Sequence, residues 1–74
     1  MSGFTFSQAL VAIKIGKKVA RTGWNGADQY VTMQRPDEHS KMTLPYAYLY
    51  NAQGQCVPWV PSQGDLFAAD WQLV

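Results

Sequence analysis

Residues 4–16 carry a complete set of signals for one short amphipathic helix. Thr5 and Gln8 stand three residues apart, as in a capping box, and Phe4 takes the position of a hydrophobic staple. Apolar side chains then recur at helical spacing on one face, at Phe6, Ala9, Leu10 and Ile13. Gly16 follows them, at the position where a left-handed residue commonly ends a helix. The sequence therefore predicts a helix over residues 6–15.

The remaining sequence alternates short β-favouring runs with turn residues. We expect strands over 17–21, 29–34, 46–50, 55–60 and 71–74, a turn over 22–26, and a helical turn over 66–69. Residues 51–54 should form a hairpin turn, and Pro58 should confine its strand to a sheet edge or a bulge. The most solvated and mobile loop is expected over 35–41. The predicted fold class is α+β, with one N-terminal amphipathic helix packed on a small antiparallel β-sheet and a short helical turn before the last strand.

The chain carries much apolar material for its length. Its 74 residues are expected to form one domain, residues 1–74. A domain of this size buries only roughly 60% of the surface that its unfolded chain exposes. Because 47% of the residues are hydrophobic, self-association is the expected way to cover the rest. Tyr46, Tyr48 and Tyr50 would share one strand face, which suits a subunit interface.

Charge and composition argue against several partners and chemistries. The formal net charge is +1 without a block of like charge, so a nucleic-acid polymer is not an expected partner. No apolar run approaches the roughly 20 residues of a membrane span, and no signal peptide opens the sequence, so no membrane partner is expected. His39 and Cys56 form neither a recognised nucleophile–base pair nor a metal-ligand set. We therefore expect no catalytic residues, no metal and no cofactor.

A first candidate binding cluster lies in residues 21–26. Trp24 at a turn could stack on a nucleobase, and Arg21 could hold phosphate oxygens in a bidentate fork. Asn25 adds an amide. Structural alternatives stand beside these roles: Trp24 could cover one end of the core, Asn25 could belong to a simple Asn-Gly turn, and Arg21 could pair with Asp28 or Asp70.

A second cluster follows in the loop after Pro58. Ser62 and Asp65 fit a capping-box variant, and the helix start that they cap would offer N–H donors to a phosphate or ribose oxygen. Gln63 could read a base edge, whereas Asp65 would repel phosphate and should meet a ribose hydroxyl or an amino group. Tyr46 could also reach the pocket, and Trp59 and Trp71 are expected in the core or an interface.

Three motifs from these segments occur together in one known family. They are Phe-x-x-Ala-Leu from residue 6, Gly-Lys-Lys-Val-x-Arg-x-Gly-Trp-Asn-Gly from residue 16, and Pro-Trp-x-x-Ser-Gln-x-Asp-Leu from residue 58. Over residues 4–26 and 45–74 the chain resembles the Thoeris anti-defence type 2 family, small bacteriophage proteins that sequester nucleotide immune signals. Gly64 and Phe67 depart from the last motif.

The resemblance implies a function that the residues alone do not. It implies a protein of the host bacterial cytoplasm that captures glycocyclic ADP-ribose, with cyclic dinucleotides as a second ligand class, and does not cleave them. It also implies a homotetramer whose pockets are shared between subunits. Two other functions stay open: a protein–protein inhibitor acting through the tyrosine face, and a phosphodiesterase-like enzyme in which Asp65 and Asp70 converge.

Overall fold

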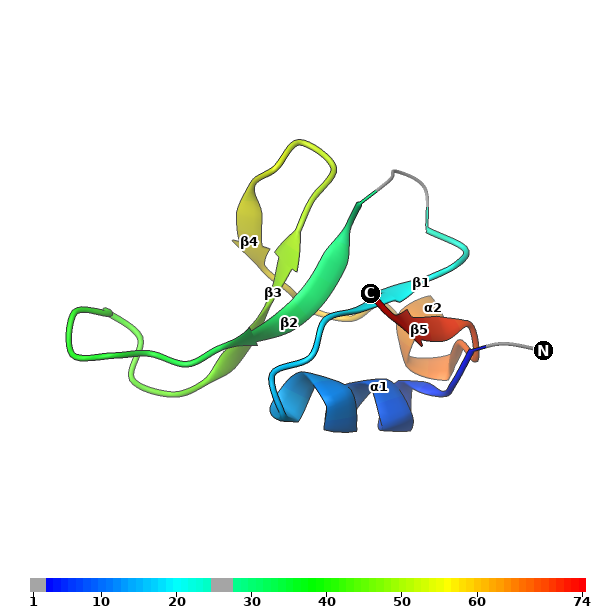
Figure 1. Cartoon of the computed structure of the whole chain (residues 1–74), viewed down its shortest axis with the longest axis horizontal. Helices are drawn as coiled ribbons and strands as arrows, with labels where there is room; N and C mark the ends of the chain where they lie inside the picture. Colours follow the sequence, from blue (N-terminus) through cyan, green and yellow to red (C-terminus); the bar gives the residue numbers. More distant parts are fainter. Residues whose placement is uncertain (1–2, 25–27) are drawn as a thin grey trace.

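The computed structural model describes residues 3–24 and 28–74. An antiparallel sheet of five strands in the order β4-β3-β2-β1-β5 carries a helix packed against it (Figure 1). The elements along the chain are α1 (Phe6–Lys14), β1 (Val19–Arg21), β2 (Tyr30–Gln34), β3 (Tyr46–Tyr50), β4 (Cys56–Pro58), α2 (Gln63–Phe67) and β5 (Trp71–Leu73). The α+β class predicted from the sequence is confirmed.

Helix α1 begins with the predicted capping box. The Gln8 backbone N–H donates to the Thr5 hydroxyl oxygen at 3.4 Å, and the Thr5 N–H donates to Gln8 Oε1 at 2.9 Å. The helix ends one residue earlier than expected, at Lys14, and the chain turns at Gly16 with φ of 89°. Ala9 and Ile13 are buried against the sheet. Leu10 was expected on the same face as these two residues. It is instead exposed at the edge of the helix, because the side of the helix that packs on the core includes Ala12 rather than Leu10.

The strands match the predicted positions; β3 has the predicted bounds, and the other four are shorter than expected. Strand β1 starts at Val19 because the Lys17 N–H still donates to Ala12 O in the turn after α1. Strand β4 covers only Cys56–Pro58 and is an edge strand, as Pro58 predicted. Strand β5 pairs with β1, with Arg21 opposite Trp71, and this places two distant segments of the sequence side by side.

The second helix lies earlier in the chain than expected. The helical turn predicted over 66–69 is instead α2, Gln63–Phe67. Ser62 is its N-cap, and its hydroxyl oxygen accepts from the Asp65 N–H at 3.1 Å. The cap fixes the first turn directly after Ser62, and Ala68 returns to an extended conformation, so the helix cannot extend to residue 69.

The core lies between α1 and the sheet. Its buried members are Ala9, Ile13, Val19, Val31 and Trp71. Trp71 is the largest of the fully buried side chains among the described residues, and its indole N–H donates to Asp65 O at 3.1 Å. The prediction that Trp71 belongs to the core is confirmed, while Trp59 packs on the core and stays half-buried.

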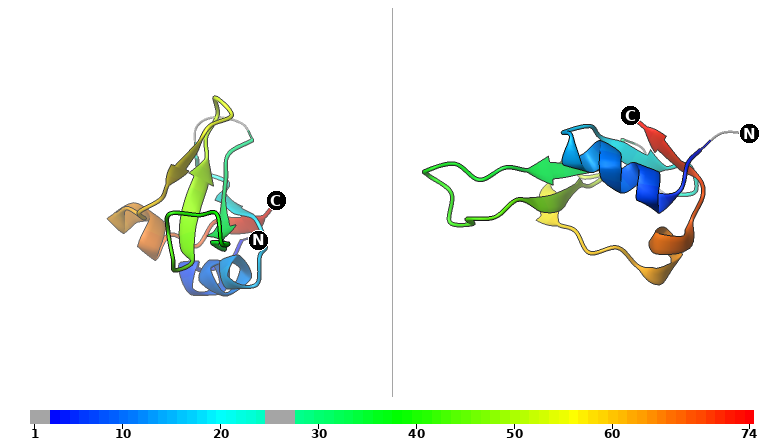
Figure 2. Two further views of the ribbon diagram at one scale, coloured as in Figure 1. Left: turned by 90° about the vertical axis from the view of Figure 1, so that its left-hand side faces the viewer. Right: turned by 90° about the horizontal axis from the view of Figure 1, so that it is seen from below.

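Residues 35–45, which we call the arm, connect β2 to β3 and project from the body. In Figure 1 and in the right-hand view of Figure 2 the arm is a long loop beyond the sheet, and it lies at the opposite end of the molecule from α2; the left-hand view of Figure 2 looks at the arm end-on. The protein is accordingly elongated, 42 × 26 × 21 Å. Apart from half-buried Pro36, every residue of the arm is exposed.

Candidate functional site

Arg21, at the end of β1, lies between two carboxylates. Its Nη1 is 3.0 Å from Asp65 Oδ1, and its Nε is 2.8 Å from Asp70 Oδ1. The three side chains are 24%, 11% and 31% exposed. The hydrogen bonds to Asp70 and Asp65 raise the pKa of Arg21. This cluster joins β1 to α2 and to the residue before β5, so it fixes three elements relative to one another.

Asp65 is the buried member of the cluster. Burial is the largest single influence on its pKa and raises it, but several hydrogen bonds together outweigh burial and lower the pKa below 3.8. Oδ2 accepts from the Ser62 N–H at 3.0 Å, and Oδ1 accepts from Arg21 and from Trp24 Nε1 at 3.3 Å. Asp65 therefore caps α2 and orients two predicted site residues with the same carboxylate.

Asp70 shapes the turn after β1. The hydrogen bond from Arg21 is the main reason that its pKa lies below 3.8, and the Gly23 backbone N–H adds to the effect. Oδ2 accepts from that N–H at 2.9 Å and from the Thr22 hydroxyl at 3.3 Å. A Cβ at position 23 would stand 2.9 Å from Asp70 Oδ2. Glycine therefore allows the carboxylate to close onto the backbone that leads to Trp24.

Trp24 is held at a fixed angle by its neighbours. Its ring meets Trp71 edge-to-face, with centroids 5.4 Å apart, and meets Trp59 at 6.5 Å. A pocket of about 210 Å³ is lined by Trp24, Gln29, Leu49, Trp59 and Asp65. A second pocket of about 280 Å³ also includes Trp24, together with Arg21, Asp28 and Gln29. The indole thus lines two adjoining hollows that carry both aromatic and polar groups.

The structure brings together four of the seven predicted site residues: Arg21, Trp24, Ser62 and Asp65. Gln63 is the exposed first residue of α2, next to the cap. Asn25 lies outside the described residues. Tyr46 lines a different hollow, of about 160 Å³, with Gln34, Tyr48 and Pro58. Because Tyr46 and the pocket residue Leu49 point to opposite faces of β3, one chain does not bring Tyr46 to Trp24.

Some features of this site were not predicted from the sequence. Arg21 was weighed as a partner of Asp28 or Asp70, and the pairing with Asp70 is confirmed. The pairing of Arg21 with Asp65 was not predicted, because the capping motif had already assigned the Asp65 carboxylate to the start of the helix. Trp59, which was expected in the core or an interface, and Leu49, which was not considered, also line the site.

Residues with reactive side chains lie apart from this cluster. Cys56 is an exposed thiol in the edge strand β4, and His39 lies in the arm, 3.6 Å from Glu38, with both side chains largely exposed. Among residues 3–24 and 28–74, no His, Cys, Asp and Glu side chains gather in a group of three that could hold a metal. Within the same ranges, no helix is long and apolar enough to cross a membrane.

The sequence matches a known protein family over nearly its whole length. The family model of the Thoeris anti-defense 2-like domain matches residues 4–74. The chain belongs to that family. It is similar to the Thoeris anti-defense 2 protein of Bacillus phage SP01, with 28% identity over 83 aligned residues that cover 95% of this chain and 93% of the phage protein.

Proposed function

We propose that this chain is a bacteriophage anti-defence protein that captures a cyclic nucleotide immune signal and withholds it without cleaving it. Family membership and the relative's name support action against Thoeris defence. The single observation that carries the binding proposal is Trp24, an oriented indole between two polar hollows. The proposed ligands are glycocyclic ADP-ribose and, as a second class, cyclic dinucleotides. The proposed place of action is the host bacterial cytoplasm.

Trp24 has the properties of a nucleobase platform. The hydrogen bond to Asp65 and the edge contacts with Trp59 and Trp71 fix the ring before any ligand arrives. A base that stacks on a fixed ring loses less free energy to ordering the protein. Stacking of this kind contributes about 1–3 kcal/mol for each base. Nanomolar capture needs about 12 kcal/mol, so polar contacts must supply most of the binding free energy.

The charges around Arg21 suggest which polar group of the ligand each neighbouring residue would bind. Arg21 carries one positive charge between two carboxylates, so a phosphate that reaches its 24% exposed side chain also meets Asp65 and Asp70. We therefore assign phosphate oxygens to the exposed edge of Arg21 and to the amides of Asn25 and Gln63. A ribose hydroxyl or a base amino group is assigned to Asp65. The remaining phosphate charge calls for a cation from a neighbouring subunit.

The pockets are small for such a ligand. Small-molecule sites span about 300–1,000 Å³, whereas the hollows beside Trp24 hold about 210 and 280 Å³. Neither hollow alone reaches the lower end of that range. We propose that subunits of a homotetramer complete the pocket. In this arrangement Tyr46, on the opposite sheet face, would come from a neighbouring subunit. Ser62, as the N-cap, would hold the first turn of α2 in position to face the ligand.

Calorimetry against cyclic ADP-ribose isomers and cyclic dinucleotides tests the proposal. Trp24→Ala and Gln63→Ala should each weaken binding at least tenfold. Matched controls are Phe67→Ala, an aromatic residue that is 84% exposed on α2, and Gln53→Ala in the β3–β4 turn, and both should bind as the parent does. Circular dichroism checks that each variant is folded. Parental affinity in both folded site variants would place the pocket elsewhere.

Recovery of the ligand separates sequestration from catalysis. After the complex is denatured, chromatography should return the cyclic nucleotide intact and in equal amount. A linear or hydrolysed product would instead support the phosphodiesterase-like alternative, with Asp65 and Asp70 on either side of Arg21. Failure to bind any nucleotide, together with capture of a host defence enzyme by the purified chain, would support the protein–protein inhibitor.

A further inference from the structure

The arm presents apolar side chains that its own chain does not cover. Met42 is 54% exposed and Leu44 is 75% exposed, on the limb that returns toward β3. The tip before them carries Asp37 and Glu38. Exposed apolar residues that stand on a projecting loop cannot be buried by small shifts of the body, so a second surface must cover them.

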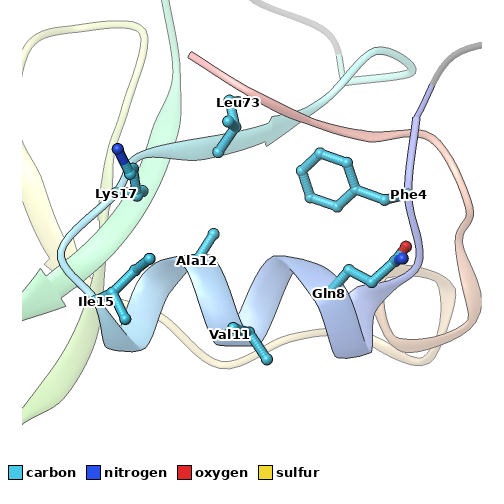
Figure 3. Close-up of a pocket in the computed structure, with 7 residues that line it drawn as sticks. All are labelled: Phe4, Gln8, Val11, Ala12, Ile15, Lys17 and Leu73. Carbon is cyan, nitrogen blue, oxygen red and sulfur yellow. The ribbon is translucent and has the colours of Figure 1, made fainter.

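A groove on the body has the complementary character. It lies between α1 and β5, holds about 310 Å³, and is lined mainly by apolar side chains (Figure 3). Phe4, Ala12 and Leu73 point toward one another across it, and Val11 and Ile15 line the helix side. Lys17 stands at one end, and no carboxylate is among the described residues that line the groove.

We propose that the arm of one chain docks in the α1–β5 groove of a second copy. Met42 and Leu44 would fill the apolar part of the groove, whose volume suits two such side chains. The two carboxylates of the arm, Asp37 and Glu38, would lie near Lys17 and near Lys14 in the last turn of α1, and Lys41 would lie on the side of the arm away from these lysines. Apolar contact would supply most of the free energy, and the opposite charges would set the direction of docking.

The arm is not positioned to fill its own groove. Arg35 Nη2 donates to Lys14 O at 3.2 Å and so fixes the base of the arm at the C-terminal end of α1. From that point the arm runs away from the helix and the sheet, as Figure 1 and the right-hand view of Figure 2 show. A second copy is therefore the occupant that the geometry favours, and two chains can exchange arms reciprocally about a twofold axis.

The exposed area of the chain agrees with an exchange of this kind. The surface measures 5228 Å², whereas a compact monomer of this mass exposes about 4,600 Å². The excess, about 600 Å² for each chain, is surface that a contact with a second copy can cover. The radius of gyration, 12.4 Å, also exceeds the value of about 11 Å for a compact chain of this length.

Cross-linking between two single-cysteine variants tests the contact directly. In a Cys56→Ser background, Leu44→Cys in one chain and Val11→Cys in a second chain with a size tag are mixed and treated with a mild oxidant. A disulfide-linked species of mixed size is expected. Gln53→Cys, at an exposed residue of the β3–β4 turn and so at the other end of β3 from the arm, replaces Leu44→Cys as the control and should give at least tenfold less. Equal yields from the two mixtures would overturn the proposal.

The second test measures how the oligomer dissociates on dilution. Met42→Asp/Leu44→Asp should raise the concentration at which light scattering reports dissociation at least tenfold, while Gln53→Asp/Gln55→Asp, at exposed residues of the β3–β4 connection, should not. This inference rests on the self-association proposed above, but not on the ligand. A parent chain that is monomeric throughout, or whose mass the arm substitutions leave unchanged, would overturn the docking. Intact capture of a cyclic nucleotide by that same chain would still support sequestration.

Discussion

The single carboxylate of Asp65 accepts hydrogen bonds from three neighbouring residues. It caps α2 through the Ser62 N–H, pairs with Arg21 and accepts from the indole of Trp24. Its side chain is 11% exposed, so water cannot replace these partners in the folded chain. At the scale of the residue, the stability of the fold and the orientation of the site therefore depend on the same charge.

Neutralising that charge should destabilise the protein. Asp65→Asn keeps the shape of the side chain but leaves Arg21 with one carboxylate and weakens the cap. We expect a loss of about 2–4 kcal/mol in the free energy of unfolding, measured in urea, because one partner of a buried pair is removed. Glu38→Gln, at an exposed residue of the arm, is the control and should change little. Equal effects would contradict a special role for Asp65.

Acid should weaken the fold through the same groups. The folded chain lowers the pKa of both Asp65 and Asp70 below 3.8. Around pH 3–4 the unfolded chain then binds more protons, so stability rises with pH there. The urea midpoint should stay nearly constant from pH 7 to about 5, begin to fall near the unfolded pKa, and continue to fall as the pH drops through the folded values. Asp70→Asn should flatten this decline, and an unchanged profile would show that Asp70 does not contribute.

At the scale of the element, local signals determined each helix and turn. Two capping boxes start α1 and α2, and the β3–β4 turn places its strands in register from Tyr48 opposite Pro58 to Tyr50 opposite Cys56. These features depend on residues a few positions apart, which is why they could be predicted from the sequence. The start of α2 at Gln63 was missed, although the cap that fixes it was identified, because Pro61 and Gly64 led us to assign residues 61–64 to a loop.

Substitution of two glycines tests the backbone conformation at the connections between elements. Gly3 and Gly16 both have positive φ, 108° and 89°, which disfavours any other residue. A Cβ at Gly3 would also stand 2.8 Å from Ala69 O, whereas a Cβ at Gly16 would meet nothing within 4 Å. Gly16→Ala should cost about 1 kcal/mol of stability in urea unfolding. Gly3→Ala should cost clearly more, and equal losses would show that Gly3 can move away from the strand.

The order of the strands and the composition of the site could not be predicted in the same way. The pairing of β1 with β5, and the place of Arg21 between Asp65 and Asp70, come from contacts across more than 40 residues. The sequence supplied candidates for that site because aromatic and polar residues cluster in its loops. It could not show that one arginine bridges two of them, or that Tyr46 faces away from Trp24.

At the scale of the whole molecule, one chain leaves apolar surface uncovered in several places, two of which we propose to be partners. One is the arm with Met42 and Leu44, and the other is the groove between α1 and β5. The pocket beside Trp24 is small in a single chain. Assembly would thus cover apolar surface and enlarge the binding site together.

Dilution should therefore weaken ligand capture. If subunits complete the pocket, the apparent affinity for a cyclic nucleotide should fall once the protein is diluted below the concentration at which the oligomer dissociates. Fluorescence of the tryptophans, measured with and without ligand over a dilution series, reports binding, and light scattering at the same concentrations reports mass. Affinity that is independent of mass would show that each chain holds a complete pocket.

The bonds of Arg21 also bear on how fast the protein folds. Asp65 and Asp70 lie 44 and 49 residues along the chain from it, and β5 must find β1 across a similar span. Each such contact requires a long loop to close, and the entropy cost of closing that loop comes before the contact contributes any stabilising free energy. Chains dominated by distant pairings reach the native state in milliseconds to seconds, far more slowly than helical bundles of equal stability. A site built from such contacts can form only once nearly the whole chain has come together, so no early folding intermediate of this protein should bind the ligand.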